Sequence, residues 1–166
     1  MIRTIVADDH RLVRAGLVGL LKNKKDIEVI AEAGTAEEAI RLSNELKPDL
    51  LLLDLDMPDL DGIEATKRIV SSNPITRVLI LTMHENEEYA IRVLRVGASG
   101  FIVKGISPEE LAEAIRKVAR GEIFITESII DKLNQRHKKG GDTENPLAVL
   151  SDRELQVFIR LARGMA

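Results

Sequence analysis

The chain has 166 residues, of which 45% are hydrophobic and 31% charged, a balance typical of one soluble, core-forming domain with room for a small appendage. The 24 Lys and Arg against 27 Asp and Glu leave a net charge of −3, which argues against a wholly basic nucleic-acid binder. Cysteine is absent, so disulfides, thiolate zinc sites and cysteine nucleophiles are excluded. The sequence has no apolar run near the roughly 20 residues that span a bilayer and no signal-peptide pattern, so we expect a cytoplasmic protein without membrane contact.

Short apolar runs alternate with amphipathic stretches as far as residue 120. The apolar runs predict five strands, at 2–7, 27–33, 50–53, 78–81 and 100–103. The amphipathic stretches predict five helices, at 10–21, 36–46, 62–70, 87–96 and 108–120. The third strand is four consecutive leucines, which is typical of a parallel strand buried on both faces. The alternation predicts a doubly wound α/β fold, a five-stranded parallel sheet with helices on both faces.

The remaining residues follow a different pattern. A short helix is predicted at 126–135. The polar stretch 136–146 contains Gly, Asn and Pro and predicts a flexible linker. Ser151 and Glu154 then form a capping box at the start of another amphipathic helix.

Polar side chains gather where the predicted strands end. Asp8 and Asp9 follow the first strand, Asp54 the third, Thr82 the fourth and Lys104 the fifth. Because the carboxyl ends of parallel strands meet at one edge of the sheet, these side chains are expected to lie together. One acid at such a place can simply cap the next helix, but several acids repel one another unless a cation lies among them.

Mg²⁺ suits this predicted cluster, because it prefers oxygen ligands and is usually held by one or two carboxylates with phosphate and water. A hydroxyl and an ammonium beside the metal would neutralise a phosphoryl group. A strand-end aspartate can itself accept that phosphoryl group, since it is already ionised at neutral pH. The cluster therefore predicts phosphoryl chemistry.

Four segments carry a family resemblance in the order in which they occur. They are Asp8-Asp9, LLLLDLDMPDLDG at 50–62, ILT at 80–82 and GASGFIVK at 97–104. Together they resemble the receiver domain of two-component response regulators over residues 1–122. The resemblance implies a flavodoxin-like fold with strand order 2-1-3-4-5.

The resemblance also implies roles for the acids. Asp54 would be the phosphoacceptor. Mg²⁺ would be held by Asp9, Asp54 and the main-chain carbonyl of Asp56, with Asp8 acting through water.

Further roles follow from the same resemblance. Lys104 would pair with a phosphoryl oxygen, and Thr82 would move to bond it. Phe101 would be the aromatic side chain that turns inward when Thr82 moves, while Pro58 and Gly62 would shape the loop after the acceptor.

Two side chains flank the predicted path of hydrolytic water. Asp56 lies two places after the acceptor, and His84 lies two places after Thr82. They are candidates for tuning the lifetime of the phosphoryl group, although His84 is more simply an exposed loop residue. His10 is interpreted as a residue at the start of a helix.

The segment 150–166, LSDRELQVFIRLARGMA, resembles the opening of the helix-turn-helix output domain of NarL/LuxR-type response regulators. The resemblance implies a receiver domain at 1–122, a helix and linker at 123–149, and the first helix of a truncated output domain at 150–166. It implies a sensor histidine kinase as phosphoryl donor, a homodimer on phosphorylation, and transcriptional control through DNA. Because the recognition helix is missing, no sequence-specific DNA binding by this 166-residue form is expected.

Two rival functions use similar residues. A phosphatase of the haloacid-dehalogenase type also has a strand-end aspartate with a second aspartate two places on, as Asp54 and Asp56 are, and uses Mg²⁺. In that class the nucleophile strand opens the domain, whereas here Asp8 and Asp9 come first and no acid pair follows Lys104. A flavodoxin-like FMN carrier would need a Ser/Thr/Gly-rich phosphate loop after the first strand, whereas here Asp8 and Asp9 follow that strand and would repel the phosphate. We expect a protein that accepts one phosphoryl group and loses it slowly, not a turnover enzyme.

Overall fold

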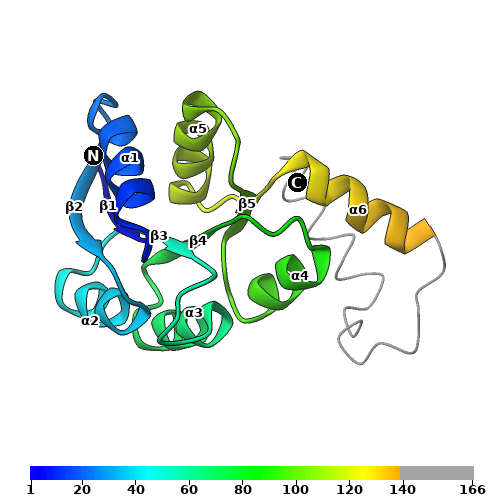
Figure 1. Cartoon of the computed structure of the whole chain (residues 1–166), viewed down its shortest axis with the longest axis horizontal. Helices are drawn as coiled ribbons and strands as arrows, with labels where there is room; N and C mark the ends of the chain where they lie inside the picture. The colour runs from blue at the N-terminus through cyan, green and yellow to red at the C-terminus, as the bar shows by residue number, and fades with distance from the viewer. Residues whose placement is uncertain (139–166) are drawn as a thin grey trace.

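The computed structural model describes residues 1–138, so the predicted output helix and most of the predicted linker lie outside the described residues. The described part is a parallel sheet covered by helices on both faces (Figure 1). Its strands are β1 (Ile2–Ala7), β2 (Ile27–Ala33), β3 (Leu50–Asp54), β4 (Arg77–Thr82), β5 (Gly100–Val103) and β6 (Phe124–Ile125). Its helices are α1 (Arg11–Lys22), α2 (Ala36–Leu46), α3 (Gly62–Ser72), α4 (Glu87–Arg95), α5 (Pro108–Ala119) and α6 (Glu127–Lys138).

The sheet has six strands in the order β2-β1-β3-β4-β5-β6, so the prediction of five strands in the order 2-1-3-4-5 was incomplete. The additional strand, β6, pairs Phe124 with Gly100 and Ile125 with Phe101. Two residues are too few to show the alternating pattern that reveals a strand. The predicted flavodoxin-like order is confirmed for the other five strands.

Helices α1 and α5 lie on one face of the sheet, and α2, α3 and α4 lie on the other (Figure 1). Strand β3 separates two apolar clusters, because Leu51 and Leu53 point into one and Leu50 and Leu52 into the other. All four leucines are buried, which confirms the prediction for this strand. Double-sided burial fixes where β3 ends and therefore where Asp54 lies.

Two predicted capping boxes set the starts of helices on opposite faces. The Thr35 hydroxyl accepts a hydrogen bond from the N–H of Glu38 at 3.1 Å, and the Ser107 hydroxyl accepts one from Glu110 at 3.1 Å. Each cap satisfies a backbone donor that the first turn of the helix leaves free.

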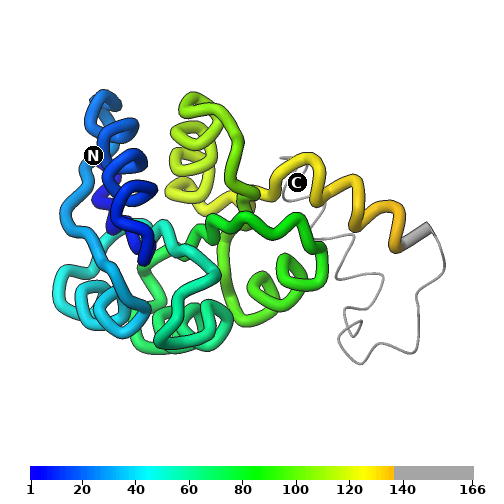
Figure 2. Tube along the Cα trace, viewed as in Figure 1, coloured from blue at the N-terminus to red at the C-terminus, as the bar shows by residue number. Residues whose placement is uncertain are grey.

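Helix α6 is longer than predicted and belongs to the folded core. It continues to Lys138, so the linker prediction was wrong for residues 136–138. Ile129, Ile130 and Leu133 are buried in the same cluster as α4. The Cα trace in Figure 2 shows α6 leaving the sheet beyond β6, on the α4 side of the molecule.

Within residues 1–138, no helix combines the length and the hydropathy needed to cross a membrane.

Candidate functional site

The carboxyl ends of β1 and β3 bring two aspartates into the protein interior. These strands are hydrogen-bonded neighbours, with Ala7 opposite Leu53, so Asp8 and Asp54 follow in adjacent positions. Their side chains are only 1% and 3% exposed. Asp9 lies beside them and is 26% exposed. We refer to Asp8, Asp9 and Asp54 as the acid pocket.

Lys104 supplies the cation that the acid pocket needs. Its Nζ donates to Asp8 Oδ2 at 3.0 Å and lies 3.6 Å from Asp54 Oδ2. The backbone N–H of Lys104 donates to the carbonyl of Thr82 at 2.6 Å, which holds the end of β5 against β4. With its side chain 14% exposed, Lys104 forms a partly desolvated ion pair with the buried acids.

Burial raises the pKa of the Asp54 carboxyl from 3.8 to about 6. A hydrogen bond from the N–H of Asp56 and the charge of Lys104 act in the opposite direction, and the neighbouring charge of Asp8 adds to the increase. The Asp56 N–H lies 3.2 Å from Asp54 Oδ1. The carboxylate is therefore ionised at neutral pH but poorly solvated. A further cation beside it, or a covalent bond at one of its oxygens, would lower the free-energy cost of burying its charge.

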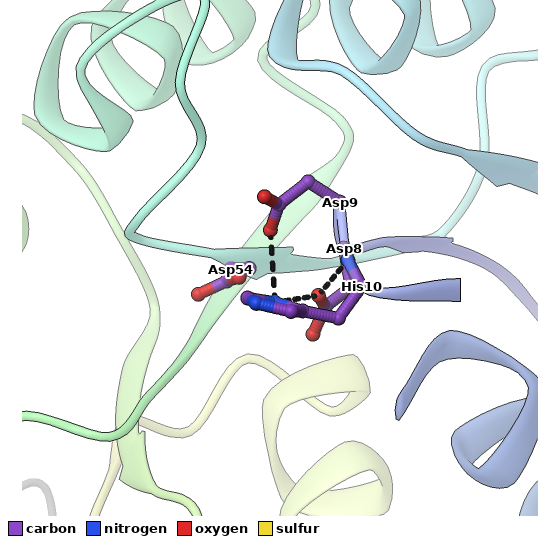
Figure 3. A group of neighbouring side chains, drawn as sticks. All are labelled: Asp8, Asp9, His10 and Asp54. Carbon is purple, nitrogen blue, oxygen red and sulfur yellow. Dashed lines mark hydrogen bonds and ion pairs between the residues drawn. The ribbon is translucent and has the colours of Figure 1, made fainter. Parts of the chain in front are cut away.

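His10 also faces the acid pocket, although it was predicted only as a residue at a helix start. Its Nδ1 lies 3.1 Å from Asp9 Oδ1 and 3.3 Å from Asp8 Oδ1 (Figure 3). Its backbone N–H donates to Asp8 Oδ1 at 2.9 Å. His10 does occupy the N-cap position of α1, but its side chain makes no capping hydrogen bond. The signal in the sequence was the position of His10 next to the acid pair.

The residues of the acid pocket fit a divalent cation. Asp9 Oδ1 is a buried oxygen without a hydrogen-bond donor. One ligand atom each from Asp8, Asp9, His10 and Asp54 lies within 4.8 Å of the others. An unsatisfied carboxylate oxygen in a group rich in oxygen ligands is what a hard cation requires.

The structure also locates the predicted switch residues. Thr82 is fully buried, and its hydroxyl accepts a hydrogen bond from the N–H of His84 at 3.1 Å. Phe101 is fully buried as well, in the cluster that covers the α4 side of the sheet. Its carbonyl accepts the N–H of Thr126 at 3.1 Å, which ties β5 to the start of α6.

The two residues predicted to flank the water path are joined. His84 Nε2 lies 2.9 Å from Asp56 Oδ2, and both side chains are about half exposed. The imidazole of His84 also lies beside the ring of Tyr89, with centroids 5.8 Å apart. This pair connects the loop after β3 to the loop after β4.

Gly62 lies where the loop after β3 enters α3. A Cβ at this position would come within 2.6 Å of the Leu55 carbonyl oxygen and 2.8 Å of its Cα. Asp61 caps the helix by accepting the N–H of Ile63 at 2.8 Å. Asp59 accepts the N–H groups of Ala36 and Glu37 at 3.0 Å each, which ties the loop to α2. Pro58 is an exposed residue of this loop.

A parallel flavodoxin-like sheet with acids and one lysine at its carboxyl edge defines a class of α/β signalling domain. Residues 4–116 match the family model of the response regulator receiver domain. The chain belongs to the response-regulator family, in its NarL/LuxR-type branch.

Relatives and solved structures agree with that assignment. The chain is 40% identical to the oxygen regulatory protein NreC of Staphylococcus haemolyticus, over 98% of this chain and 77% of the relative. It is 35% identical to the response regulator GacA of Pseudomonas aeruginosa, over 98% of this chain and 76% of that protein. A LuxR-family response regulator from Aurantimonas superposes with a TM-score of 0.79 and 35% identity, covering 82% of this chain and 97% of that chain. The phosphatase alternative receives no support from these similarities.

Proposed function

We propose that this chain accepts a phosphoryl group on Asp54 from a sensor histidine kinase and thereby controls transcription. The observation that carries the proposal is the burial of Asp54 at a strand end within 3.6 Å of the Lys104 ammonium. In the reaction, an Asp54 carboxylate oxygen bonds to phosphorus while the P–N bond of the donor phosphohistidine breaks. The bonding electrons return to the imidazole nitrogen, and an acyl phosphate remains on Asp54.

The neighbouring residues would stabilise the transferred group. Lys104 would bind a phosphoryl oxygen, for which it must share or leave its contact with Asp8. Thr82 would bond another oxygen once its hydroxyl turns from the N–H of His84, and the buried Phe101 would be the aromatic side chain whose inward position accompanies that movement. Because such an arrangement favours one position of the loop after β4, phosphorylation would shift the population between two states.

Mg²⁺ is the proposed metal of the acid pocket. Asp9, Asp54 and the main-chain carbonyl of Asp56 would hold it, and Asp8 would act through water. When bound, it would neutralise charge on the phosphoryl oxygens.

The remaining parts of the proposal concern the phosphorylated protein. Asp56 and His84, joined at 2.9 Å, would tune how fast water reaches the acyl phosphate. Phosphorylation would favour a cytoplasmic homodimer, and transcription would be controlled through an output domain of the helix-turn-helix type that binds DNA.

Labelling with a small acyl phosphate, followed by mass analysis of the intact chain, tests the acceptor. The wild type should gain one phosphoryl group and release it slowly, and Asp54→Asn should gain none. Asp61→Asn is the matched control, because it removes a carboxylate from the same loop while asparagine can still cap α3. Stoichiometric acid-labile phosphate on Asp54→Asn, or continuous turnover of a phosphate monoester by the wild type, would contradict the proposal.

A further inference from the structure

His10 brings a nitrogen ligand to a pocket otherwise lined by oxygen. The residue directly follows Asp9 and has an extended backbone, with φ −82° and ψ 106°. This conformation turns the imidazole back over the acid pair instead of along α1, as Figure 3 shows. The ring nitrogen nearest the acids is Nδ1.

The distances around His10 match the edges of a metal coordination shell. Ligands about 2.1 Å from an ion lie about 3.0 Å apart in octahedral geometry and about 3.4 Å apart in tetrahedral geometry. Nδ1 is 3.1 Å from Asp9 Oδ1 and 3.3 Å from Asp8 Oδ1. His10 Nδ1 and Asp9 Oδ1 could therefore share one ion with little movement of their side chains, and the group of Asp8, Asp9, His10 and Asp54 offers one ligand atom each within 4.8 Å of the others.

Contacts around the acid pocket leave His10 Nδ1 and Asp9 Oδ1 available to an ion. Both oxygens of Asp8 already accept hydrogen bonds, Oδ2 from Lys104 Nζ and Oδ1 from the backbone N–H of His10, so Asp8 is left to act through water. Asp9 Oδ1 is buried and accepts no hydrogen bond, and the nitrogen that faces it is His10 Nδ1 at 3.1 Å. The imidazole is 65% exposed and caps no backbone group, so it is free to turn toward an ion.

We propose that His10 Nδ1 joins Asp9 and Asp54 as a ligand, while Asp8 still acts through water, so that the acid pocket also binds a borderline transition-metal cation such as Zn²⁺ or Ni²⁺. Mg²⁺ would make no use of this nitrogen ligand. Imidazole suits Zn²⁺, Ni²⁺ and Cu²⁺, whereas carboxylate, carbonyl and water suit Mg²⁺. This inference rests on the proposed metal site. It adds transition metals to the ions that the site would bind, because carboxylates without an imidazole suit Mg²⁺ better than they suit transition metals. The consequence is that transition metals would compete with Mg²⁺ at the acid pocket.

Calorimetric titration of the 166-residue protein with NiCl₂ and with MgCl₂ tests the role of His10. The measurement is made at about pH 8, where imidazoles are neutral and able to coordinate. His10→Asn should weaken Ni²⁺ binding at least about tenfold, because even the loss of a residue that only hydrogen-bonds to a metal ligand often lowers metal affinity by that factor. Mg²⁺ affinity should stay within about twofold, because Mg²⁺ is bound through oxygen. Asparagine is a favoured N-cap, so the variant keeps the start of α1.

His137→Ala is the matched control, because it removes another of the three histidines, one that belongs to α6. Nitrogen NMR of the wild type gives a second readout that needs no variant. Zn²⁺ should shift the Nδ1 resonance of His10 and leave the resonances of His137 unmoved. Equal Ni²⁺ affinities for wild type and His10→Asn, or an unshifted His10 resonance at saturating Zn²⁺, overturn the inference. If the role of His10 is overturned but the wild type still binds Mg²⁺ and is labelled on Asp54, the proposed function stands. If the wild type binds neither Ni²⁺ nor Mg²⁺, both the proposed metal site and the role of His10 are contradicted.

Discussion

At the scale of single residues, the buried charge of Asp54 links the site to stability. The pKa of this carboxyl is raised by burial to about 6, above its ordinary 3.8, so the folded protein binds the proton more tightly than the unfolded chain does. The stabilising contribution of this proton to the folded state is fully present below about pH 4 and is lost as the pH rises through about 6. In metal-free buffer at neutral pH, Asp54 therefore destabilises the fold.

Asp54→Asn should raise the free energy of unfolding at about pH 7 by roughly 1 to 3 kcal/mol in the presence of a chelator. The difference from wild type should shrink toward zero as the pH falls below 3.8, because the wild-type carboxyl is then protonated in both states. Urea denaturation followed by circular dichroism at several pH values measures this. Asp61→Asn, at an exposed position of the same loop, should show no comparable pH dependence. A constant difference across the pH range would contradict the assignment of the effect to ionisation.

The atoms around Gly62 leave no room for a side chain, and a substitution at this position can test that restriction. Gly62→Ala should destabilise the protein by about 1 to 3 kcal/mol, because the added Cβ would lie 2.6 Å from a backbone oxygen of Leu55 and the backbone must shift. It should also slow labelling of Asp54, since that shift moves the acceptor loop. Gly19→Ala in α1 is the control, with nothing within 4 Å of the new Cβ and a gain of about 0.5 to 1 kcal/mol in helix propensity. Equal effects of the two variants would show that the contact is unimportant.

Much of the site could be predicted because strand ends are encoded strongly in the apolar runs. The four leucines of β3 fix the position of Asp54, and the same rule locates Asp8, Thr82 and Lys104. The position of His10 could not be obtained in this way. Periodicity assigns a residue to an element, whereas the direction of the His10 ring depends on backbone angles outside any regular element. The pairing of His84 with Asp56 is likewise a contact between two loops.

At the scale of elements, the sequence was informative where segments are long or capped. The capped starts of α2 and α5 were predicted correctly, because Thr35 and Ser107 are followed by glutamate three residues later. Strand β6 was missed, because its two residues are defined by pairing with β5. The end of α6 was also missed, since polar residues 136–138 continue the helix without a stop signal.

Helix α6 should contribute to the stability of the receiver fold. Leu133 is 1% exposed, and Leu133→Ala should lower the free energy of unfolding by about 2 to 4 kcal/mol through lost burial and a cavity. Gln135→Ala, on the exposed side of the same helix, should change it by less than about 0.5 kcal/mol. Chemical denaturation of the two variants distinguishes these expectations. Similar small changes for both would mean that α6 folds apart from the sheet.

Further contacts connect α6 to the loop after β4. The Lys132 ammonium donates a hydrogen bond to the carbonyl of Glu85, and the Arg136 guanidinium nitrogen Nη1 lies 3.7 Å from Glu88 Oε1 at the start of α4. The N–H of Val103 donates to the Thr126 hydroxyl at 3.0 Å. Through these contacts α6 is joined both to β5, which carries Lys104, and to the loop that follows Thr82.

At the scale of the whole molecule, the two apolar clusters hold the sheet rigid while its carboxyl edge carries unfavourable charge. The clusters lie on opposite faces and share β3, so the strands that position Asp8 and Asp54 are supported from both sides. That packing offsets the cost of burying two carboxylates beside one ammonium. A cation in the acid pocket should therefore stabilise the entire fold and not only the loops around it.

Mg²⁺ should raise the melting temperature of the wild type by mass action, because it binds the folded state only. At ten times its dissociation constant the gain is about 1.4 kcal/mol, or a few degrees for a domain of this size. Asp54→Asn should melt higher than wild type in chelator but gain less from Mg²⁺, since one proposed ligand charge is gone. The two melting curves should therefore approach each other as Mg²⁺ is added, and scanning calorimetry over a range of Mg²⁺ concentrations measures this convergence. An equal gain for both proteins would remove Asp54 from the metal site, and a wild-type melting temperature unmoved by millimolar Mg²⁺ would remove the metal from the acid pocket.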